Sequence, residues 1–486
     1  MKLITNKPEM FNDLCDEIRL FLPREEIILA EDECADTDTL SVYLTADGDF
    51  RADAVLLRDG ERFAYSHITP YRGGSELIEK RYGKRCMKTA VFRVMRRAFP
   101  DMLIPWGSLT GIRPTRLLRE LILTEGYDEA IRQMREEFDV SESKIMLADE
   151  INKIQLPIIN SSASNMFGVY VGIPFCRTRC LYCSFASQLR TKKTDMAAYL
   201  AALHKDIEMG SSMMKAKGYE PRSFYIGGGT PTILTADELD ELLDKLCECY
   251  DTNGREFTVE AGRPDTITVE KLKVMKRHGV TRVSVNPQTM CDNTLRLVGR
   301  DHNSADIIRT YEDVRSIGFD SVNMDLIAGL PNENESDFYK SLCEVEKLSP
   351  DCLTVHTLAV KRASRLHEHM DKYELPSVAT VEKMVKMGFE ASRRMGMKPY
   401  YMYRQKYMTG NLENVGYSND DAICIYNIDM MEDSMSIIAH GAGAMNKRVF
   451  REGGRIERIP NPKDIDTYIE KLSYTQRERE ALFSLE

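Results

Sequence analysis

Long apolar runs and an excess of positive charge are both absent from this chain of 486 residues. No stretch approaches the ~20 apolar residues that a membrane-spanning helix needs. The N-terminal segment MKLITNKPEMFNDL also turns polar too early for a signal peptide. The formal net charge is −10, whereas domains that mainly bind nucleic acid are usually basic. We therefore expect a cytoplasmic protein without a membrane span and without a nucleic-acid partner.

Cysteine is sparse, with twelve residues in the whole chain, which argues against a disulfide scaffold. The composition is otherwise globular, 43% hydrophobic and 29% charged, with room for two or three domains. Cys247 and Cys249 lie two apart in a helical pattern and point to different faces, so we expect no metal site there. Nine cysteines, these two included, are expected to be small buried hydrophobes: Cys15, Cys34, Cys86, Cys247, Cys249, Cys291, Cys343, Cys352 and Cys424.

The other three cysteines, Cys176, Cys180 and Cys183, stand together in the segment IPFCRTRCLYCS at 173–184. Such a loop turns three thiolates toward one point, and thiolates bind iron-sulfur clusters or zinc. No fourth cysteine or histidine follows before His204, which falls in a helical stretch. Three protein ligands would leave one iron of a four-iron cluster open to a small molecule. Three unrelated core cysteines are a poor alternative, because the loop is polar and basic.

The string YVGIPFCRTRCLYC resembles the motif of the radical S-adenosylmethionine (SAM) superfamily. The resemblance implies a [4Fe-4S] cluster whose open iron chelates the amino and carboxylate groups of SAM. It also implies that an electron from the cluster splits the adjacent C–S bond, giving methionine and a 5′-deoxyadenosyl radical. In such enzymes the protein supplies position and exclusion of water.

The segments after the cysteine loop alternate between strand and helix patterns. Strands are expected at 167–174, 223–229, 256–262, 282–287, 321–329 and 352–359, and helices near 195–217, 236–250, 268–278, 303–317 and 335–347. Six alternations imply an α/β fold with a partial parallel (β/α)6 barrel and right-handed crossovers. We expect this barrel at 166–365, an α+β domain at 1–165, and an α+β extension at 366–486 that covers the barrel mouth.

Suitable polar groups or turns follow the expected strands, where a barrel of this kind holds its ligands. The turn at 227–231, GGGTP, lets a ligand approach the backbone closely. Each of the other groups is, taken singly, more often an ordinary rim residue. Together they offer a carboxylate and hydroxyl partners for a nucleoside ligand: Glu260, Gln288, Arg300 and Asp325.

The order of motifs resembles the oxygen-independent coproporphyrinogen III oxidase group over roughly 167–445. It is most similar to the HemZ-type branch, through CLYCSF, VEAGRPD, TVHTLA and YRQKYMTGNLENVGY. Two departures from the best-known members are Gly172 in place of histidine and Phe185 in place of an additional cysteine. The resemblance implies that Tyr170 and Glu260 serve catalysis, and that Tyr170, Gly228 and Glu260 contact the SAM on the cluster. It assigns a possible second SAM to Tyr182, Gly229, Thr230, Gln288, Arg300, Asp325 and the backbone of Ala359.

The N-terminal domain contains a probable helix at 74–98 with eight Lys or Arg and no acid between 80 and 97. A solvated helix face explains such a pattern, and a basic wall for an anionic substrate is the functional alternative. Arg113 and Arg116 lie in SLTGIRPTR, between a turn and a helix, and resemble a feature of the same branch.

The resemblance implies oxidative decarboxylation of two propionates of coproporphyrinogen III, giving protoporphyrinogen IX in haem biosynthesis. A haem chaperone without oxidase activity is the alternative, but those relatives carry HNxxYW where this chain has ENVGYS at 413–418. Radical chemistry on RNA is opposed by the acidic composition. We expect a monomer that takes electrons from a reductant such as flavodoxin or ferredoxin. The candidate contacts for the tetrapyrrole carboxylates are His356, Arg263, Lys361 and Arg362.

Overall fold

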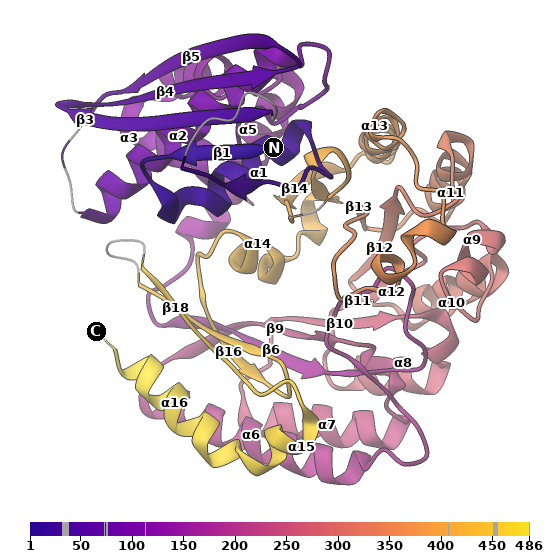
Figure 1. Ribbon diagram of the computed structural model, residues 1–486. Coiled ribbons are helices and arrows are strands. Elements are labelled where there is room, and N and C mark those ends of the chain that lie inside the picture. Colours follow the sequence, from indigo (N-terminus) through magenta and orange to yellow (C-terminus); the bar gives the residue numbers. More distant parts are fainter. Residues whose placement is uncertain are drawn as a thin grey trace. The chain divides into compact units, whose positions relative to one another are not determined.

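The computed structural model describes residues 1–31, 38–71, 73, 76–111, 113–406, 408–450 and 455–485. The chain forms two compact units (Figure 1). The first unit comprises Met1–Asp149 with Gly410–Leu412, and the second comprises Glu150–Thr409 with Glu413–Glu486. Within the described ranges, every helix is too short or too polar to cross a membrane. Cys34 and the first two residues of the expected helix at 74–98 lie outside the described residues.

The first unit is an α+β domain, as expected. Its sheet has the order β2-β1-β3-β4-β5, in which β3, β4 and β5 form an antiparallel meander. The apolar runs of the sequence supply its buried side chains, and helices α1 and α2 share one core with them. The strands are β1 (Lys2–Thr5), β2 (Ile28–Leu29), β3 (Thr39–Asp47), β4 (Asp49–Arg58) and β5 (Glu61–Thr69); the helices are α1 (Phe11–Phe21), α2 (Glu76–Ala98), α3 (Pro114–Glu125), α4 (Tyr127–Arg132) and α5 (Glu142–Asn160), which continues into the second unit.

The basic residues of α2 are largely compensated within the first unit. Five of them form ion pairs with carboxylates: Arg81 with Glu120, Lys84 with Asp13, Lys88 with Glu17, and both Arg93 and Arg96 with Asp139. Arg85 lies over the ring of Phe138, and Arg97 lies over that of Tyr65. Arg116 of the neighbouring helix also pairs with Glu120. Because these basic side chains already have partners within the unit, α2 gives little support to the hypothesis that it binds an anionic substrate.

The second unit is built on an eleven-stranded sheet with the order β14-β15-β13-β12-β11-β10-β9-β6-β16-β17-β18. Its middle is a run of six parallel strands, the six that the sequence predicts. These strands are rich in buried Val, Ile, Phe and Leu, as is typical of parallel strands that are covered on both faces. The run consists of β6 (Met166–Ile173), β9 (Glu220–Gly228), β10 (Glu256–Gly262), β11 (Arg282–Val285), β12 (Ser321–Ala328) and β13 (Cys352–Thr357).

The connecting helices lie on the outer side of these strands (Figure 1). Three of them begin with a capping box, in which an N-cap side chain and the acid three residues later satisfy each other's backbone N–H groups. The predicted (β/α)6 barrel is therefore confirmed. Its helices are α6 (Met196–Ala216), α7 (Ala236–Cys249), α8 (Val269–Arg277), α9 (Asp292–Leu297), α10 (Ser304–Ile317) and α11 (Glu335–Leu348).

The C-terminal segment extends the barrel sheet at both ends. Strands β15 and β14 add to β13 in antiparallel order, and β16 adds to β6 in parallel order. The expected boundaries at 165 and 365 stay a proposal. The elements are α12 (Arg365–Glu368), α13 (Val378–Arg394), β14 (Lys398–Tyr403), β15 (Asn414–Ser418), α14 (Ile425–Met431), β16 (Ser436–His440), β17 (Met445–Val449), β18 (Ile456–Pro460), α15 (Ile465–Glu470) and α16 (Leu472–Ser484).

A buried ionic group, here called the Asp206 cluster, fastens the last helices to the barrel. Asp206 of α6 binds Nη1 of Arg479 at 2.7 Å and lies 3.3 Å from Nδ1 of His440. It also accepts hydrogen bonds from the hydroxyl of Tyr468 at 2.7 Å and from the backbone N–H of Gly441 at 3.0 Å. Burial opposes ionisation of Asp206, but Arg479 and then His440 outweigh it and hold the pKa of the carboxyl far below its usual range.

Candidate functional site

The three loop cysteines are free thiols at the carboxyl end of the first barrel strand. Cys176 ends β7 (Phe175–Cys176), which pairs with β8 (Gln188–Leu189) and so folds the loop back on itself. The N–H of Cys183 donates to the carbonyl of Cys180 at 3.1 Å. Burial raises the pKa of the Cys183 thiol, and the neighbouring Cys180 and Cys176 raise it further. The fold thus places the three thiols in one short loop at the end of a single strand.

Arg263 supports this loop from the end of β10. Its Nε and Nη2 bind the two oxygens of Asp265 at 2.9 and 3.0 Å, and it is only 4% exposed. Its Nη1 donates to the hydroxyl of Thr178 at 2.5 Å and approaches Sγ of Cys180 at 3.8 Å. This ion pair gives little support to Arg263 as a candidate contact for substrate carboxylates, because the acid two residues along the chain balances its charge.

The glycine turn after β9 lies against the cysteine loop. The N–H of Gly229 donates to the carbonyl of Ile173, and that of Thr230 to the carbonyl of Phe175, both at 2.8 Å. A Cβ at Gly229 would lie 2.5 Å from the carbonyl oxygen of Phe175, so only glycine permits this approach. The hydroxyl of Thr230 also lies 3.6 Å from Sγ of Cys176. The turn and the loop thus form one structure at the barrel edge.

The barrel encloses a cavity of about 140 Å³. Glu260 reaches this cavity from β10 and accepts a hydrogen bond from the hydroxyl of Tyr225 on the neighbouring strand. The barrel wall surrounds the carboxyl, and this burial raises its pKa to about 7. The ring of Tyr225 stacks on Tyr426 with a centroid distance of 4.5 Å, and Tyr170 stacks beside both. An aromatic wall therefore flanks a carboxyl that titrates near neutrality.

Asp325 lines the same cavity from β12. Its carboxylate accepts a hydrogen bond from the Asn323 amide at 2.8 Å and lies 3.5 Å from Nε2 of His356. The other ring nitrogen of His356 is 3.3 Å from the hydroxyl of Tyr403. Burial alone would raise the pKa of Asp325, but His356 and Asn323 outweigh it, and the pKa is lowered. The cavity thus holds one charged carboxylate and one that is neutral up to about pH 7.

The remaining expected ligands lie around the cysteine loop and the end of β11. Arg300 is buried and donates to the carbonyl of Asn286 at 2.6 Å, and its Nε has no partner among the described residues. Burial opposes its charge, but Tyr182 and Cys180 beside it raise its pKa above the usual range. Gln288 has a φ of 67° and a buried side-chain oxygen without a partner, and it forms a bridge to Leu326 of β12. Ala359 follows β13 and forms a bridge to Met408.

Sequence reasoning predicted Glu260 and Asp325 but missed the tyrosines that share their cavity. Tyr225 lies between buried Phe224 and Ile226 in a strand. The alternation of side chains in a strand could therefore have predicted that Tyr225 faces the interior of the barrel. Tyr401 and Tyr403 belong to β14, and no local pattern indicates that this C-terminal strand faces the cavity.

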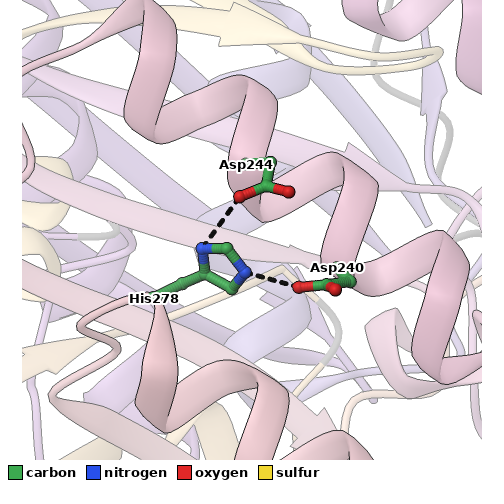
Figure 2. Close-up of side chains that lie close together, drawn as sticks. All are labelled: Asp240, Asp244 and His278. Carbon is green, nitrogen blue, oxygen red and sulfur yellow. Dashed lines mark hydrogen bonds and ion pairs between the residues drawn. The ribbon is translucent and has the colours of Figure 1, made fainter.

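A second group of possible metal ligands lies on the outer helices, away from the cavity. Figure 2 shows the ring of His278 between Asp240 and Asp244, both on α7. Asp240 approaches Nε2 at 2.5 Å and Asp244 approaches Nδ1 at 3.6 Å. Arg277 also binds Asp240, and His278 and then Arg277 hold the pKa of this carboxyl below its usual value. The two acids lie at opposite nitrogens of the ring, so the group links α7 to the end of α8.

Comparison with known proteins agrees with this geometry. Residues 170–342 match the radical SAM superfamily, which places the cysteine loop and the barrel in the class of radical SAM proteins. The chain is 38% identical over 412 residues to the oxygen-independent coproporphyrinogen-III oxidase-like protein HemZ of Bacillus subtilis, covering 83% of this chain and 82% of the relative. The chain belongs to the family that this HemZ protein represents.

Two further proteins are similar over shorter ranges or at lower identity. The haem chaperone HemW of Bacillus subtilis is 33% identical over 212 residues, which are 43% of this chain and 55% of the chaperone. The structure of the coproporphyrinogen III oxidase HemN from Escherichia coli superposes with a TM-score of 0.53 at 22% identity. That superposition covers 66% of this chain and 72% of HemN, and it supports the fold.

Radical SAM proteins hold a [4Fe-4S] cluster and SAM. The residues of this chain fit both groups. Cys176, Cys180 and Cys183 supply three thiol ligands in one loop, and Gly229 lets the turn lie against the backbone of that loop because it lacks a Cβ. Oε1 of Gln288 and Nε of Arg300 are buried and have no hydrogen-bond partner among the described residues. These two atoms can serve as ligand contacts.

Proposed function

We propose that the protein catalyses the oxygen-independent oxidative decarboxylation of coproporphyrinogen III to protoporphyrinogen IX. The name and the extent of the HemZ relative support this choice. The similarity to HemW supports a second candidate, a haem chaperone without oxidase activity. The two candidates differ in what the barrel must hold: an oxidase must bring a propionate side chain to SAM, whereas a carrier must offer an axial ligand to haem iron.

The observation that favours the oxidase is the structure of the segment ENVGYS at 413–418. Its last five residues form β15, which lies between β13 and β14 and is buried along its whole length. The side chain of Asn414 accepts the N–H of Thr357 at 2.8 Å. A Cβ at Gly416 would lie 1.8 Å from the ring of Tyr401. A central, closely packed strand cannot present an iron ligand at the surface, and this one has no histidine to present.

The side chains around the cavity suggest how the reaction is arranged. When bound, the cluster and SAM would supply the one-electron chemistry that removes a hydrogen atom from the β-carbon of a propionate side chain. Glu260 and the Gly228 turn would bind the polar groups of SAM, and Tyr170 would pack beside it. The stacked tyrosines would exclude water from the reacting centre. Asp325, with Gln288, Arg300, Tyr182, Gly229, Thr230 and Ala359, would form a second SAM site.

The carboxylates of the substrate need cations near the barrel mouth. With Arg263 occupied, Lys361 and Arg362 remain as candidates at the end of β13. Arg362 is exposed and Lys361 is half-buried, and neither has an acidic partner among the described residues. Burial lowers the pKa of Lys361, while Cys183 acts in the opposite direction. In each turnover step a carboxylate would leave as CO2 and one electron would pass to an external acceptor.

The decisive experiment is anaerobic incubation of cluster-loaded protein with SAM, dithionite and coproporphyrinogen III. Mass spectrometry should show the loss of two carboxyl groups from the substrate. We expect Arg362→Gln to raise KM roughly tenfold or more, since a contact between charged groups contributes about 1.5–3 kcal/mol. Lys205→Gln, an exposed lysine of α6 without an acidic partner among the described residues, is the charge-matched control. Tight stoichiometric haem binding without CO2 release would favour the chaperone.

The cluster itself is tested without substrate. Replacing Cys176, Cys180 or Cys183 by Ala should abolish the iron-sulfur absorbance of the reconstituted protein, because each supplies one of three protein ligands. Cys247→Ala should leave the absorbance unchanged, since the Cys247 thiol contacts the carbonyl of His278 at 3.8 Å and the hydroxyl of Thr252 at 3.5 Å, outside the cysteine loop. A full cluster in any of the three loop variants would refute the ligand assignment.

A further inference from the structure

The segment VEAGRPD at 259–265 contains two charged residues that the proposed reaction does not use. Arg263 and Asp265 follow β10, and their side chains are only 4% and 7% exposed. A buried ion pair is costly to desolvate, so its presence is weak evidence for a role in stability alone. The pair lies against the cysteine loop and against the segment GRDH at 299–302, and these neighbours suggest another role.

Every nitrogen of the Arg263 guanidinium is bound to a protein group. Nε and Nη2 donate to the two carboxylate oxygens of Asp265 at 2.9 and 3.0 Å. Nη1 donates to the hydroxyl of Thr178 at 2.5 Å and to Sγ of Cys180 at 3.8 Å, and both of these groups belong to the cysteine loop. Arg300 differs, because its Nε has no partner among the described residues. Arg263 is therefore engaged within the protein rather than open to a ligand.

The partners of this guanidinium are themselves held in place. Oδ1 of Asp265 also lies 3.2 Å from Nδ1 of His302, whose side chain is only 1% exposed. The hydroxyl of Thr178 donates in turn to the carbonyl of Gly299 at 2.9 Å. Arg177, which is 53% exposed, lies 3.8 Å from the Asp265 carboxylate. The two bonds to the carboxylate fix the plane of the guanidinium and hold Nη1 toward the loop.

We propose that Arg263 is a positioning residue for the iron-sulfur cluster, and that its hydrogen bond to Sγ of Cys180 makes the cluster easier to reduce. Hydrogen bonds to the sulfurs are among the features that set the reduction potential of such clusters. Reduction adds one electron from an external reductant, and thus one negative charge, which a directed N–H group stabilises. Because Asp265 balances the charge of Arg263, the effect depends on the direction of this N–H group. The proposal rests on the radical SAM class of the chain and not on its substrate.

The reduction potential of the reconstituted cluster tests this role without substrate or turnover. The anaerobic protein is titrated with dithionite in the presence of redox mediators, and the electron paramagnetic resonance signal of the reduced cluster is measured. Arg263→Gln should lower the ratio of reduced to oxidised cluster about tenfold at a given applied potential. For a one-electron couple this is a shift of about 59 mV to lower potential. Iron content and absorbance of the oxidised protein show whether each variant carries a full cluster.

Two further variants separate a directed hydrogen bond from charge. Arg179→Gln removes the same charge from the cysteine loop itself, but Arg179 is exposed and donates to the carbonyl of Ala363 at 2.6 Å. Solvent screens such a charge, so this variant should keep the potential of the parent. Arg263→Lys keeps the charge beside Asp265 but lacks the fork that binds a carboxylate and the loop together. Its potential should fall below that of the parent, and it carries the test if Arg263→Gln does not load a cluster.

Three results would overturn the proposal. The first is an unchanged potential in Arg263→Gln or in Arg263→Lys, and the second is an equal shift in Arg179→Gln. The third is loss of the cluster from both Arg263 variants, which would show that Arg263 holds the loop rather than setting the potential. The titration needs no tetrapyrrole, so failure of the protein to decarboxylate coproporphyrinogen III would leave each of these results interpretable.

Discussion

Asp206 and Glu260 are both surrounded by protein in the second unit, but their partners differ. Asp206 is held by the guanidinium of Arg479, by His440, by the Tyr468 hydroxyl and by a backbone N–H. Among side chains of the described residues, Glu260 has a hydrogen bond only from Tyr225. The pKa of Asp206 is accordingly far below its ordinary value, whereas that of Glu260 is raised to about 7.

This difference separates a carboxylate that holds the fold from one that is available to a ligand. A buried charge with a complete set of partners has no capacity left for a further molecule. A carboxyl beside a cavity, with one side-chain donor and the backbone N–H of Gly228, gains most when a cation or an N–H group of a ligand arrives. The contrast can be tested by removing each charge in turn.

The largest effect is expected at Asp206. Asp206→Asn leaves the fully buried Arg479 without its counter-charge, and breaking a buried pair typically costs about 3–5 kcal/mol of the free energy of unfolding. Guanidinium chloride unfolding followed by circular dichroism measures this loss. Glu208→Gln is the control on the same helix, because the exposed pair of Glu208 with Lys245 contributes less than about 1 kcal/mol. Equal stability of the two variants would remove the distinction drawn here.

In contrast to Asp206→Asn, Glu260→Gln should increase the stability of the ligand-free protein at neutral and alkaline pH. Because the pKa of Glu260 is about 7 when folded and 4.5 is its ordinary value, the folded state keeps a proton that the unfolded chain releases between these pH values. Stability conferred by the neutral carboxyl is therefore lost as the pH rises through this window. The variant cannot ionise, so it should match the parent near pH 4.5 and exceed it by roughly 2–3 kcal/mol at pH 8.

The same variant should lose affinity for SAM, since it keeps the shape of the side chain but not its charge. We expect a roughly 10- to 150-fold weaker dissociation constant by equilibrium dialysis, which corresponds to about 1.5–3 kcal/mol. A variant that is neither more stable at pH 8 nor weaker in SAM binding would show that Glu260 resembles Asp206 in role.

The smallest effect is expected for Tyr225→Phe. The hydroxyl of Tyr225 favours the ionised form of Glu260, so its removal should raise the pKa of this carboxyl by about one unit. The titration can be followed by carbon-13 NMR of labelled glutamate. Tyr426→Phe is the control, because its ring stacks on Tyr225 but its hydroxyl makes no described hydrogen bond to Glu260. An unchanged pKa in the Tyr225 variant would show that burial alone sets it.

The sequence predicts the barrel well because its evidence is local. All six strands and the five long helices between them follow from runs of β-branched residues and from helical periodicity. The three cysteines are equally local, since the ligands lie within eight residues. The glycine turn and Glu260 are predictable for a related reason: they follow strand ends, which all meet at one edge of a parallel sheet.

What the sequence does not predict depends on partners far along the chain. The sequence does not indicate that Arg263 is paired with Asp265. This ion pair forms only when the turn between the two residues is folded. The positive charge of α2 is balanced by acids such as Asp139 and Glu120, which no periodicity connects to it. Nothing in the sequence around Asp206 predicts its ion pair with Arg479, which lies far along the chain.

The pairing of β16 with β6 has a consequence for the order in which the protein is made. A ribosome releases β6 about 260 residues before β16, an interval of roughly 13–50 s at 5–20 residues per second. Throughout that time one edge of the nascent barrel has no neighbouring strand, and an uncovered edge is a site for pairing with other chains. We therefore expect the nascent chain to depend on chaperones until β16 emerges, and chains released before β16 to aggregate.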